Sequence, residues 1–271
     1  MRKKYHFLGL IMALAIFTVF TNAYAFDPSL IAAWTFEEGS GGTTVDITGK
    51  GHDGTVFGEP KWTGVTNGKG LSIMDVEQYV RVADSDDLHF EDNDFTFTAW
   101  ISIDNFDAPL PLCILSKRSL AEKNACPSLM WVVGDGANQL ELQMRDDSAG
   151  LNSLTAKTQL KAKVWYHVAV VKDPKNVTFY INGVEDGKLP HGFDGSFTSY
   201  QPLFIGVHHW GIFEPIVWDS TLTGIIDEVG VFNKVLTSEE IKNLMPNLLA
   251  VEASGKMATS WGHIKSDSAS F

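Results

Sequence analysis

The stretch FTFTAWISI, residues 95–103, decides the fold. Apolar and polar side chains alternate along most of it, and many of its residues are aromatic or β-branched. Alternation with a period of two is typical of a β-strand that buries one face. We therefore expect a strand here with one face in a hydrophobic core.

Similar short runs recur along the chain, separated by clusters of Gly, Asp, Asn and Pro. With 95–103 they make about eleven or twelve strand candidates, among them 30–36, 70–74, 78–82, 114–116, 129–133, 140–145, 164–172, 177–181, 202–207 and 224–232. Asn182-Gly183 is a strong hairpin signal, because both turn residues need positive φ. One helix is expected over 238–245, with Thr237 or Ser238 as its cap. This pattern predicts an all-β antiparallel sandwich with one short C-terminal helix.

Four groups of segments, in order along the chain, carry a family resemblance. They are AWTFEEGSG (33–41) with DITGKGHDGTV (46–56), YVRV (79–82) with FTFTAWI (95–101), WYHVAVVK (165–172) with VTFYING (177–183), and PLFIG (202–206) with GIIDEVGVFNKVLTSEEI (224–241). Over residues 30–245 the chain resembles the LamG-like jelly-roll domains of the concanavalin A-like lectin/glucanase superfamily. The resemblance implies two stacked curved sheets, an extracellular setting and often calcium or glycan binding. Residues 104–124 and 208–223 match the family poorly.

The ends of the chain differ from its middle. Residues 1–25 read as a signal peptide, with a basic start, an apolar run over 8–20 and small residues at Ala23 and Ala25. The apolar run is short for a membrane span, which needs roughly 20 residues, although a retained anchor is the alternative. We expect one domain over 26–245 and a polar, Ser/Ala-rich tail over 246–271 that is partly ordered at best.

The net charge and the two cysteines indicate which class of partner is disfavoured and where the protein is located. The formal net charge is −12, so the chain has no electrostatic reason to bind nucleic acid. In an exported chain, Cys113 and Cys126 predict one disulfide that closes a short loop. We expect a secreted or cell-envelope protein with no membrane span after signal cleavage.

The loop after residue 36 is rich in glycine and carboxylates. In sandwiches of this kind the first and last strands lie side by side, which would bring this loop near Asp227. Gathered carboxylates repel one another unless a cation sits among them, and calcium takes six to eight oxygens. One reading is a calcium site with Asp46 and Asp227 as ligands and Glu37 as a further candidate. The other is a metal-free clasp, in which the carboxylates accept hydrogen bonds from backbone amides.

No catalytic pattern stands out in the sequence. Glycoside hydrolysis needs two facing carboxylates, and the E-x-D-x-x-E pattern of laminarinase-type relatives does not occur. Glu141 is a lone carboxylate in its strand, and the adjacent Asp227 and Glu228 should point to opposite faces. No G-x-S-x-G or H-E-x-x-H motif is present. We expect no enzymatic activity.

The segment HHWGIFEPIVWD, residues 208–219, is the densest aromatic cluster in the chain. One interpretation is a sugar-stacking platform formed by its aromatic residues with a carboxylate nearby, namely Trp210, Phe213, Trp218 and Asp219. The other is a hydrophobic plug that seals the sandwich edge. Further candidates, if their side chains face the concave sheet, are Tyr79, Arg81 and Arg145.

The function that the sequence favours is a secreted, non-catalytic module that binds a carbohydrate or a cell-surface protein, with a structural calcium ion. The alternative is a structural or adhesive domain of the cell envelope without a small ligand. A glycan hydrolase is the third hypothesis.

Overall fold

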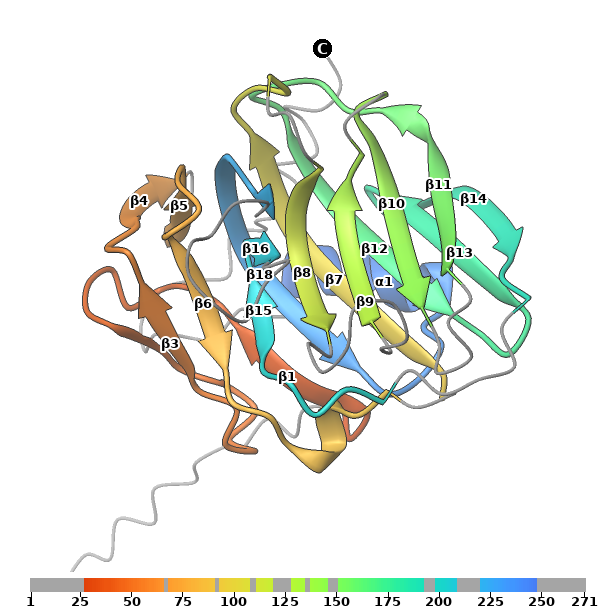
Figure 1. Cartoon of the computed structure of the whole chain (residues 1–271), viewed down its shortest axis with the longest axis horizontal. Helices are drawn as coiled ribbons and strands as arrows, with labels where there is room; N and C mark the ends of the chain where they lie inside the picture. The colour runs from red at the N-terminus through yellow and green to blue at the C-terminus, as the bar shows by residue number, and fades with distance from the viewer. Residues whose placement is uncertain are drawn as a thin grey trace, which may run out of the picture.

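The computed structural model describes residues 27–65, 68–90, 93–107, 111–118, 128–134, 137–145, 151–192, 198–208 and 220–247. These residues form a two-layer antiparallel β-sandwich with a helix, as the sequence predicts (Figure 1). No helix in the described part of the chain is long and apolar enough to cross a membrane.

Sheet A runs in the order β14 (Val184–Pro190), β13 (Asn176–Ile181), β12 (Trp165–Lys172), β7 (Phe95–Ile103), β18 (Gly224–Phe232), β5 (Gly68–Ile73) and β4 (Lys61–Val65), with β1 (Leu30–Trp34) also pairing with β18. Sheet B runs in the order β11 (Leu151–Gln159), β10 (Gln139–Arg145), β9 (Ser128–Val133), β8 (Leu112–Arg118), β15 (Leu203–Ile205), β6 (Tyr79–Val82), β3 (Gly54–Phe57) and β2 (Thr43–Thr44). The remaining elements are the pair β16 (Val207–His208) and β17 (Ser220–Thr221), the 3-10 helix η1 (Asp86–Leu88) and α1 (Ser238–Asn247).

Three predictions about particular elements are confirmed. The turn at Asn182 and Gly183 has positive φ at both residues, and it joins β13 to β14. Thr237 caps α1 in a capping box: its backbone N–H donates to Glu240, and the Glu240 N–H donates to the Thr237 hydroxyl. The first and last strands, β1 and β18, pair antiparallel.

The main core lies between the two sheets. Sheet A contributes side chains such as Phe97 and Ile101 of β7, and sheet B contributes Val80 of β6 and Leu142 of β10. In Figure 1 the strands of sheet B lie in front of those of sheet A, with α1 behind. Side chains on the sheet B strands that do not enter this core point away from sheet A, and we call this side the outer face of sheet B. Near its centre, Cys113 and Val132 are buried in a small cluster of their own.

The prediction that residues 95–103 bury only one face is wrong. All nine residues of β7 are buried. Phe97 and Ile101 face the main core, and Thr98 and Trp100 are buried on the opposite side of sheet A. The reason is that sheet A is packed on both sides: α1 contributes Ile241 to a second hydrophobic cluster with β1 and β12.

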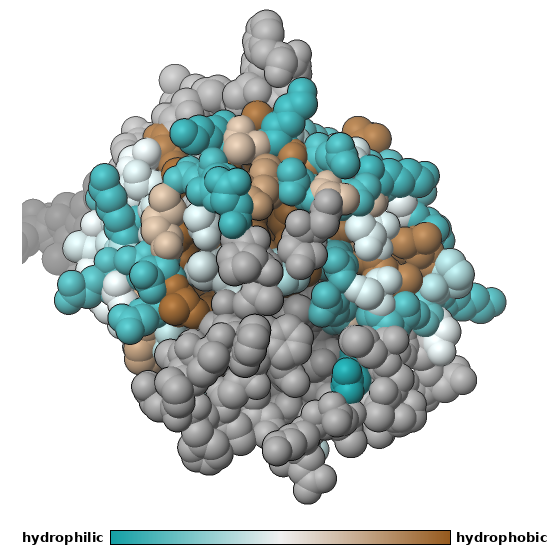
Figure 2. Space-filling view, turned by 45° about the horizontal axis from the view of Figure 1, so that its top comes forward, coloured by the Kyte–Doolittle hydropathy of each residue, from teal (hydrophilic) through white to brown (hydrophobic). Residues whose placement is uncertain are grey.

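The coloured surface in Figure 2 is mainly hydrophilic, with hydrophobic residues in small separate groups. This agrees with a formal net charge of −12. Within the coloured part of that view, no wide apolar patch of the kind that marks a permanent protein interface is seen.

Candidate functional site

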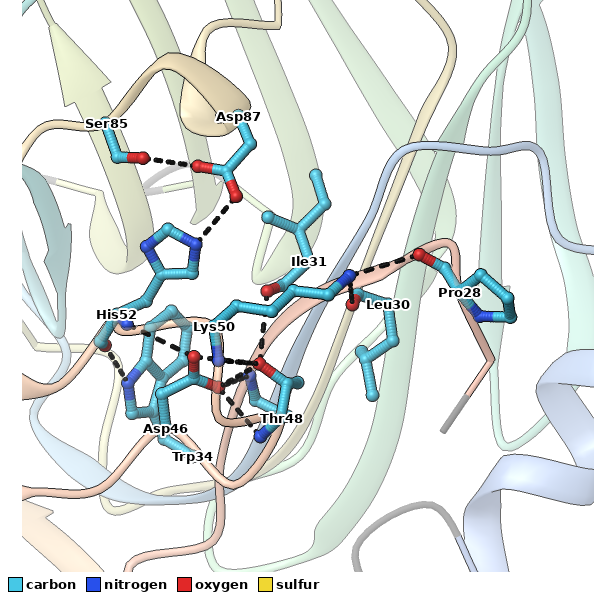
Figure 3. Close-up of polar contacts among 11 residues, drawn as sticks. Pro28, Leu30, Ile31, Trp34, Asp46, Thr48, Lys50, His52, Ser85 and Asp87 are labelled. Atoms are coloured by element: carbon cyan, nitrogen blue, oxygen red, sulfur yellow. Dashed lines mark hydrogen bonds and ion pairs between the residues drawn. The ribbon is translucent and has the colours of Figure 1, made fainter. Parts of the chain in front are cut away.

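The Asp46 carboxylate is buried and surrounded by hydrogen-bond donors (Figure 3). Oδ1 accepts the backbone N–H of Ala33 of β1 at 3.1 Å and that of Thr48 at 3.0 Å. Oδ2 accepts the backbone N–H of His52 at 3.2 Å. The Thr48 hydroxyl lies 2.8 Å from both oxygens. Asp46 therefore ties β1 to the loop that follows it, and we call this arrangement the Asp46 clasp.

His52 extends the clasp in two directions. Its backbone carbonyl accepts the indole N–H of Trp34 at 2.8 Å, and its Nε2 lies 2.9 Å from Oδ2 of Asp87 in η1. The Ser85 hydroxyl donates to the other oxygen of Asp87. Partial burial raises the pKa of Asp87, but the hydrogen bonds from Ser85 and His52 outweigh it and hold that pKa below its usual value. The loop thus connects sheet A to η1, at one end of sheet B.

Lys50 adds a third attachment. Its ammonium group donates to the carbonyl oxygens of Pro28 at 3.1 Å and Leu30 at 2.6 Å. The residues that enter β1 are therefore held by the same loop (Figure 3).

The predicted calcium ligands do not fit a shared metal site. Both oxygens of Asp46 already face N–H and O–H donors, which occupy the lone pairs that a cation would need. Glu37 is exposed and accepts the backbone N–H of Lys69, and Asp227 is buried in β18 opposite Trp100. Among the described residues no group of three or more His, Cys, Asp or Glu could hold a metal ion. The geometry fits the metal-free clasp, and calcium binding stays a prediction.

We expect a chelator to leave the melting temperature of the chain unchanged, because four donors satisfy Asp46 without a metal. Calorimetric melts in excess calcium and in excess chelator measure this directly. An ion bound at about 100 times its dissociation constant would add about 2.7 kcal/mol to the free energy of unfolding. A melting temperature several degrees lower in chelator would therefore establish a calcium site.

Several predicted residues lie outside the described part of the chain. They are the stacking residues Trp210, Phe213 and Trp218, the nearby Asp219, and Cys126. The structure shows no disulfide at Cys113, whose thiol is free and buried on β8, and burial raises its pKa above the usual value. The disulfide and the stacking platform stay predictions.

The structure brings the three further candidates onto the outer face of sheet B. On β6, Val80 and Val82 enter the core, so Tyr79 and Arg81 face outward. On β10, Leu140, Leu142 and Met144 are buried, and the alternate residues, including Arg145, are partly exposed.

An aromatic cluster, Phe57, Tyr79 and Phe204, lies on this face. Phe57 and Tyr79 are opposite each other on β3 and β6, with ring centroids 4.9 Å apart and planes 16° from parallel. Tyr79 meets Phe204 of β15 at 5.9 Å and 64°. In the next register position Arg81 lies between Thr55 and Phe204. The sequence indicated Tyr79 and Arg81 but not Phe57 or Phe204, whose place beside them depends on strand pairing.

The other end of the outer face is polar. Glu141 of β10 accepts a hydrogen bond from the Gln143 side-chain amide at 2.8 Å and another from the Ser153 hydroxyl. Thr155 of β11 is opposite Glu141 in register and is exposed. As the sequence indicated, Glu141 is the one carboxylate on its strand.

A buried lysine holds the loops at the end of sheet B beside η1. The ammonium group of Lys117 donates to Asp84 at 2.5 Å and to the carbonyl oxygen of Gln201 at 2.6 Å. Burial lowers the pKa of Lys117, although the contact with Asp84 opposes the shift. His89 lies 3.0 Å from the second oxygen of Asp84. No sequence pattern predicted this network, because its members come from three separate segments of the chain.

The solved structures most similar in shape include binding domains of other proteins. The binding domain of Paraclostridial Mosquitocidal Protein 1 aligns with a TM-score of 0.63 and 14% identity over 81% of this chain and 52% of that one. Domain 4 of AbnA, an extracellular arabinanase from Geobacillus stearothermophilus, was solved with arabinotriose. It aligns with a TM-score of 0.61 and 18% identity over 80% of this chain and 98% of that domain. The ligand binding domain of botulinum neurotoxin serotype D was solved with N-acetylneuraminic acid. It aligns with a TM-score of 0.60 and 14% identity over 80% of this chain and 50% of that one.

This chain spans about half the length of the two toxin structures. At such low identities the similarity establishes the fold and no more. No curated protein sequence matches the chain.

A family model, Laminin_G_3, matches residues 75–242. The match covers more than half of the sequence and includes β6 to β18. The chain therefore belongs to the concanavalin A-like lectin/glucanases superfamily.

Proposed function

We propose that this chain is a non-catalytic module that binds a carbohydrate on the outer face of sheet B. The observation that carries the proposal is the aromatic cluster beside Arg81 and Thr55. Aromatic rings pack against the C–H faces of sugar rings, while neighbouring polar groups hydrogen-bond to sugar hydroxyls. Strand pairing holds the backbone of these residues in place, and the contacts between the rings restrict their side chains, so less conformational entropy is lost when a ligand binds.

Two observations outside the site support a glycan as the ligand. The coloured part of the surface in Figure 2 is mainly hydrophilic, which favours a polar ligand over a large hydrophobic partner. Two similarly folded domains, from the arabinanase and the neurotoxin, are known in complex with arabinotriose and N-acetylneuraminic acid.

The carboxylates of the described strands support the non-catalytic part of the proposal. A retaining glycosidase needs two carboxyl groups about 5–5.5 Å apart, and an inverting one needs two at about 6.5–9.5 Å. Among the described outward-facing strand residues of sheet B, Glu141 is the single carboxylate, and it is held by Gln143 and Ser153. This single anchored carboxylate matches neither pair, which supports a non-catalytic module.

We place this module outside the cell, as a secreted or cell-envelope protein. The support is the basic and apolar character of residues 1–25, which lie outside the described part of the chain. An exported module of this kind would meet polysaccharides directly.

A glycan array with the chain from residue 26 onward tests the proposal. We expect binding to one class of sugar, with and without chelator, because the outer face of sheet B needs no metal in this proposal. Tyr79→Ala should weaken that binding by about tenfold or more, since it removes the central ring of the cluster. Tyr79→Phe keeps the ring and is the matched control, so it should retain most of the affinity.

The opposite results are equally clear. A blank array would remove the carbohydrate proposal and favour a structural or adhesive domain. Equal binding by wild type and Tyr79→Ala would move the ligand away from the aromatic cluster. Release of reducing sugar from any bound glycan would show that the protein is an enzyme.

A further inference from the structure

We infer that the glycan bound by the outer face of sheet B is acidic and carries carboxylate or sulfate groups. This inference rests on the proposed function, because it uses the same face. Its basis is the distribution of arginine. The chain has four arginines, and three of them, Arg81, Arg118 and Arg145, lie on strands of sheet B. The strands of sheet A contain lysines but no arginine.

Strand register places these three arginines in neighbouring rows. Arg81 is opposite Phe204, which is opposite Ser116 of β8. Two positions further along β8, Arg118 is opposite Ser128, and Ser128 is opposite Arg145 of β10.

Neighbouring strands lie about 4.8 Å apart, so the Arg118 and Arg145 positions are about 10 Å from each other. Arg81 and Arg118 are likewise separated by one intervening strand, β15. This spacing is comparable with the length of a disaccharide.

The chemistry of the guanidinium group selects the ligand. Its planar fork binds a carboxylate or a sulfate through two parallel hydrogen bonds, whereas a lysine acts as a point charge. Arg81 is exposed, and within the described part of the chain it forms no ion pair or hydrogen bond with a protein group. The net charge of −12 repels an anion from most of the surface. The exposed guanidinium beside the aromatic cluster is the local positive group that would bind an anionic sugar.

One protein carboxylate opposes an acidic ligand on this face. Glu141 lies four positions before Arg145 on the same strand and on the same face. Its hydrogen bonds with Gln143 and Ser153 fix it in place. Its charge should therefore weaken the binding of an anion, and Glu141→Gln, which keeps the size of the side chain, should strengthen it.

Titration of the chain from residue 26 onward with three probes tests the inference. The probes are an oligogalacturonate for carboxylate groups, a heparin oligosaccharide for sulfate groups, and a neutral arabino-oligosaccharide. We expect tighter binding of one acidic probe than of the neutral one, and the two acidic arms identify the anion. Raising the ionic strength should weaken only the acidic complex, because the Debye length falls from about 10 Å at 0.1 M to about 3 Å at 1 M.

Variants assign the effect to the arginine. Arg81→Gln should weaken the acidic complex about tenfold and the neutral complex much less, because the neutral sugar loses only a hydrogen bond to a hydroxyl group. Arg81→Lys keeps the positive charge but loses the planar guanidinium group. Its affinity for the acidic probe should lie between those of the wild type and Arg81→Gln. Lys61→Gln, at an exposed position of β4 in sheet A, removes an equal charge from the other sheet and should change neither complex.

The outcomes separate the two proposals. If the neutral probe binds as tightly as both acidic ones, or if Arg81→Gln weakens all complexes equally, the acidic ligand is refuted and the carbohydrate module stands. If none of the probes binds and the glycan array is blank, the proposed function itself fails, and the inference falls with it.

Discussion

Replacing Asp46 with alanine is expected to lower the free energy of unfolding by about 3–5 kcal/mol. The carboxylate accepts the backbone N–H groups of Ala33, Thr48 and His52. Its removal leaves these donors without an acceptor in a site that is closed to water, and each buried unsatisfied donor costs about 1–3 kcal/mol. Urea unfolding followed by tryptophan fluorescence measures the loss.

Asp53→Ala is the matched control for this experiment. Asp53 belongs to the same loop but is exposed and accepts one hydrogen bond, from the Asp46 N–H at 2.8 Å. Its loss should cost about 1 kcal/mol. The loss of stability in Asp46→Asn should lie between those of Asp46→Ala and Asp53→Ala, because the amide keeps one accepting oxygen. Equal stability of the Asp46→Ala and Asp53→Ala variants would show that the Asp46 clasp does not fasten β1.

Replacing Trp100 with alanine is expected to cost about 3–5 kcal/mol of stability. The indole is fully buried on β7, between Asp227 of β18 and His167 of β12 in the register of sheet A. Its ring lies 5.3 Å from the His167 ring in an edge-on arrangement. The substitution leaves a cavity in the centre of the sheet, which the neighbouring β-strands cannot collapse to fill.

The matched control is Trp165→Ala. Trp165 lies on β12 opposite Ser102 of β7, on the same face as Trp100, but it is only half-buried. Burial is complete for Trp100 and only partial for Trp165. Denaturant midpoints should therefore fall much further for Trp100→Ala. A Trp100→Ala variant as stable as wild type would contradict the central position of β7.

The sequence determined those features whose causes are local. The turn at Asn182-Gly183 follows from two residues that tolerate positive φ, and the start of α1 follows from the spacing of Thr237 and Glu240. The alternating and apolar runs fixed the all-β sandwich, because side chains of a strand point to opposite faces. The family resemblance supplied the pairing of the first and last strands, which the structure confirms.

Only the tertiary structure decided which residues from distant strands and loops become neighbours. The aromatic cluster and the rows of arginines depend on pairing between β3, β6, β15, β8 and β10, which are far apart in the sequence. Whether Asp46 meets a cation or amide donors depended on where Ala33 and His52 are held, and composition could not reveal that. Hydrogen-bond geometry and burial depend on contacts between distant segments, and a sequence pattern records only the preferences of neighbouring residues.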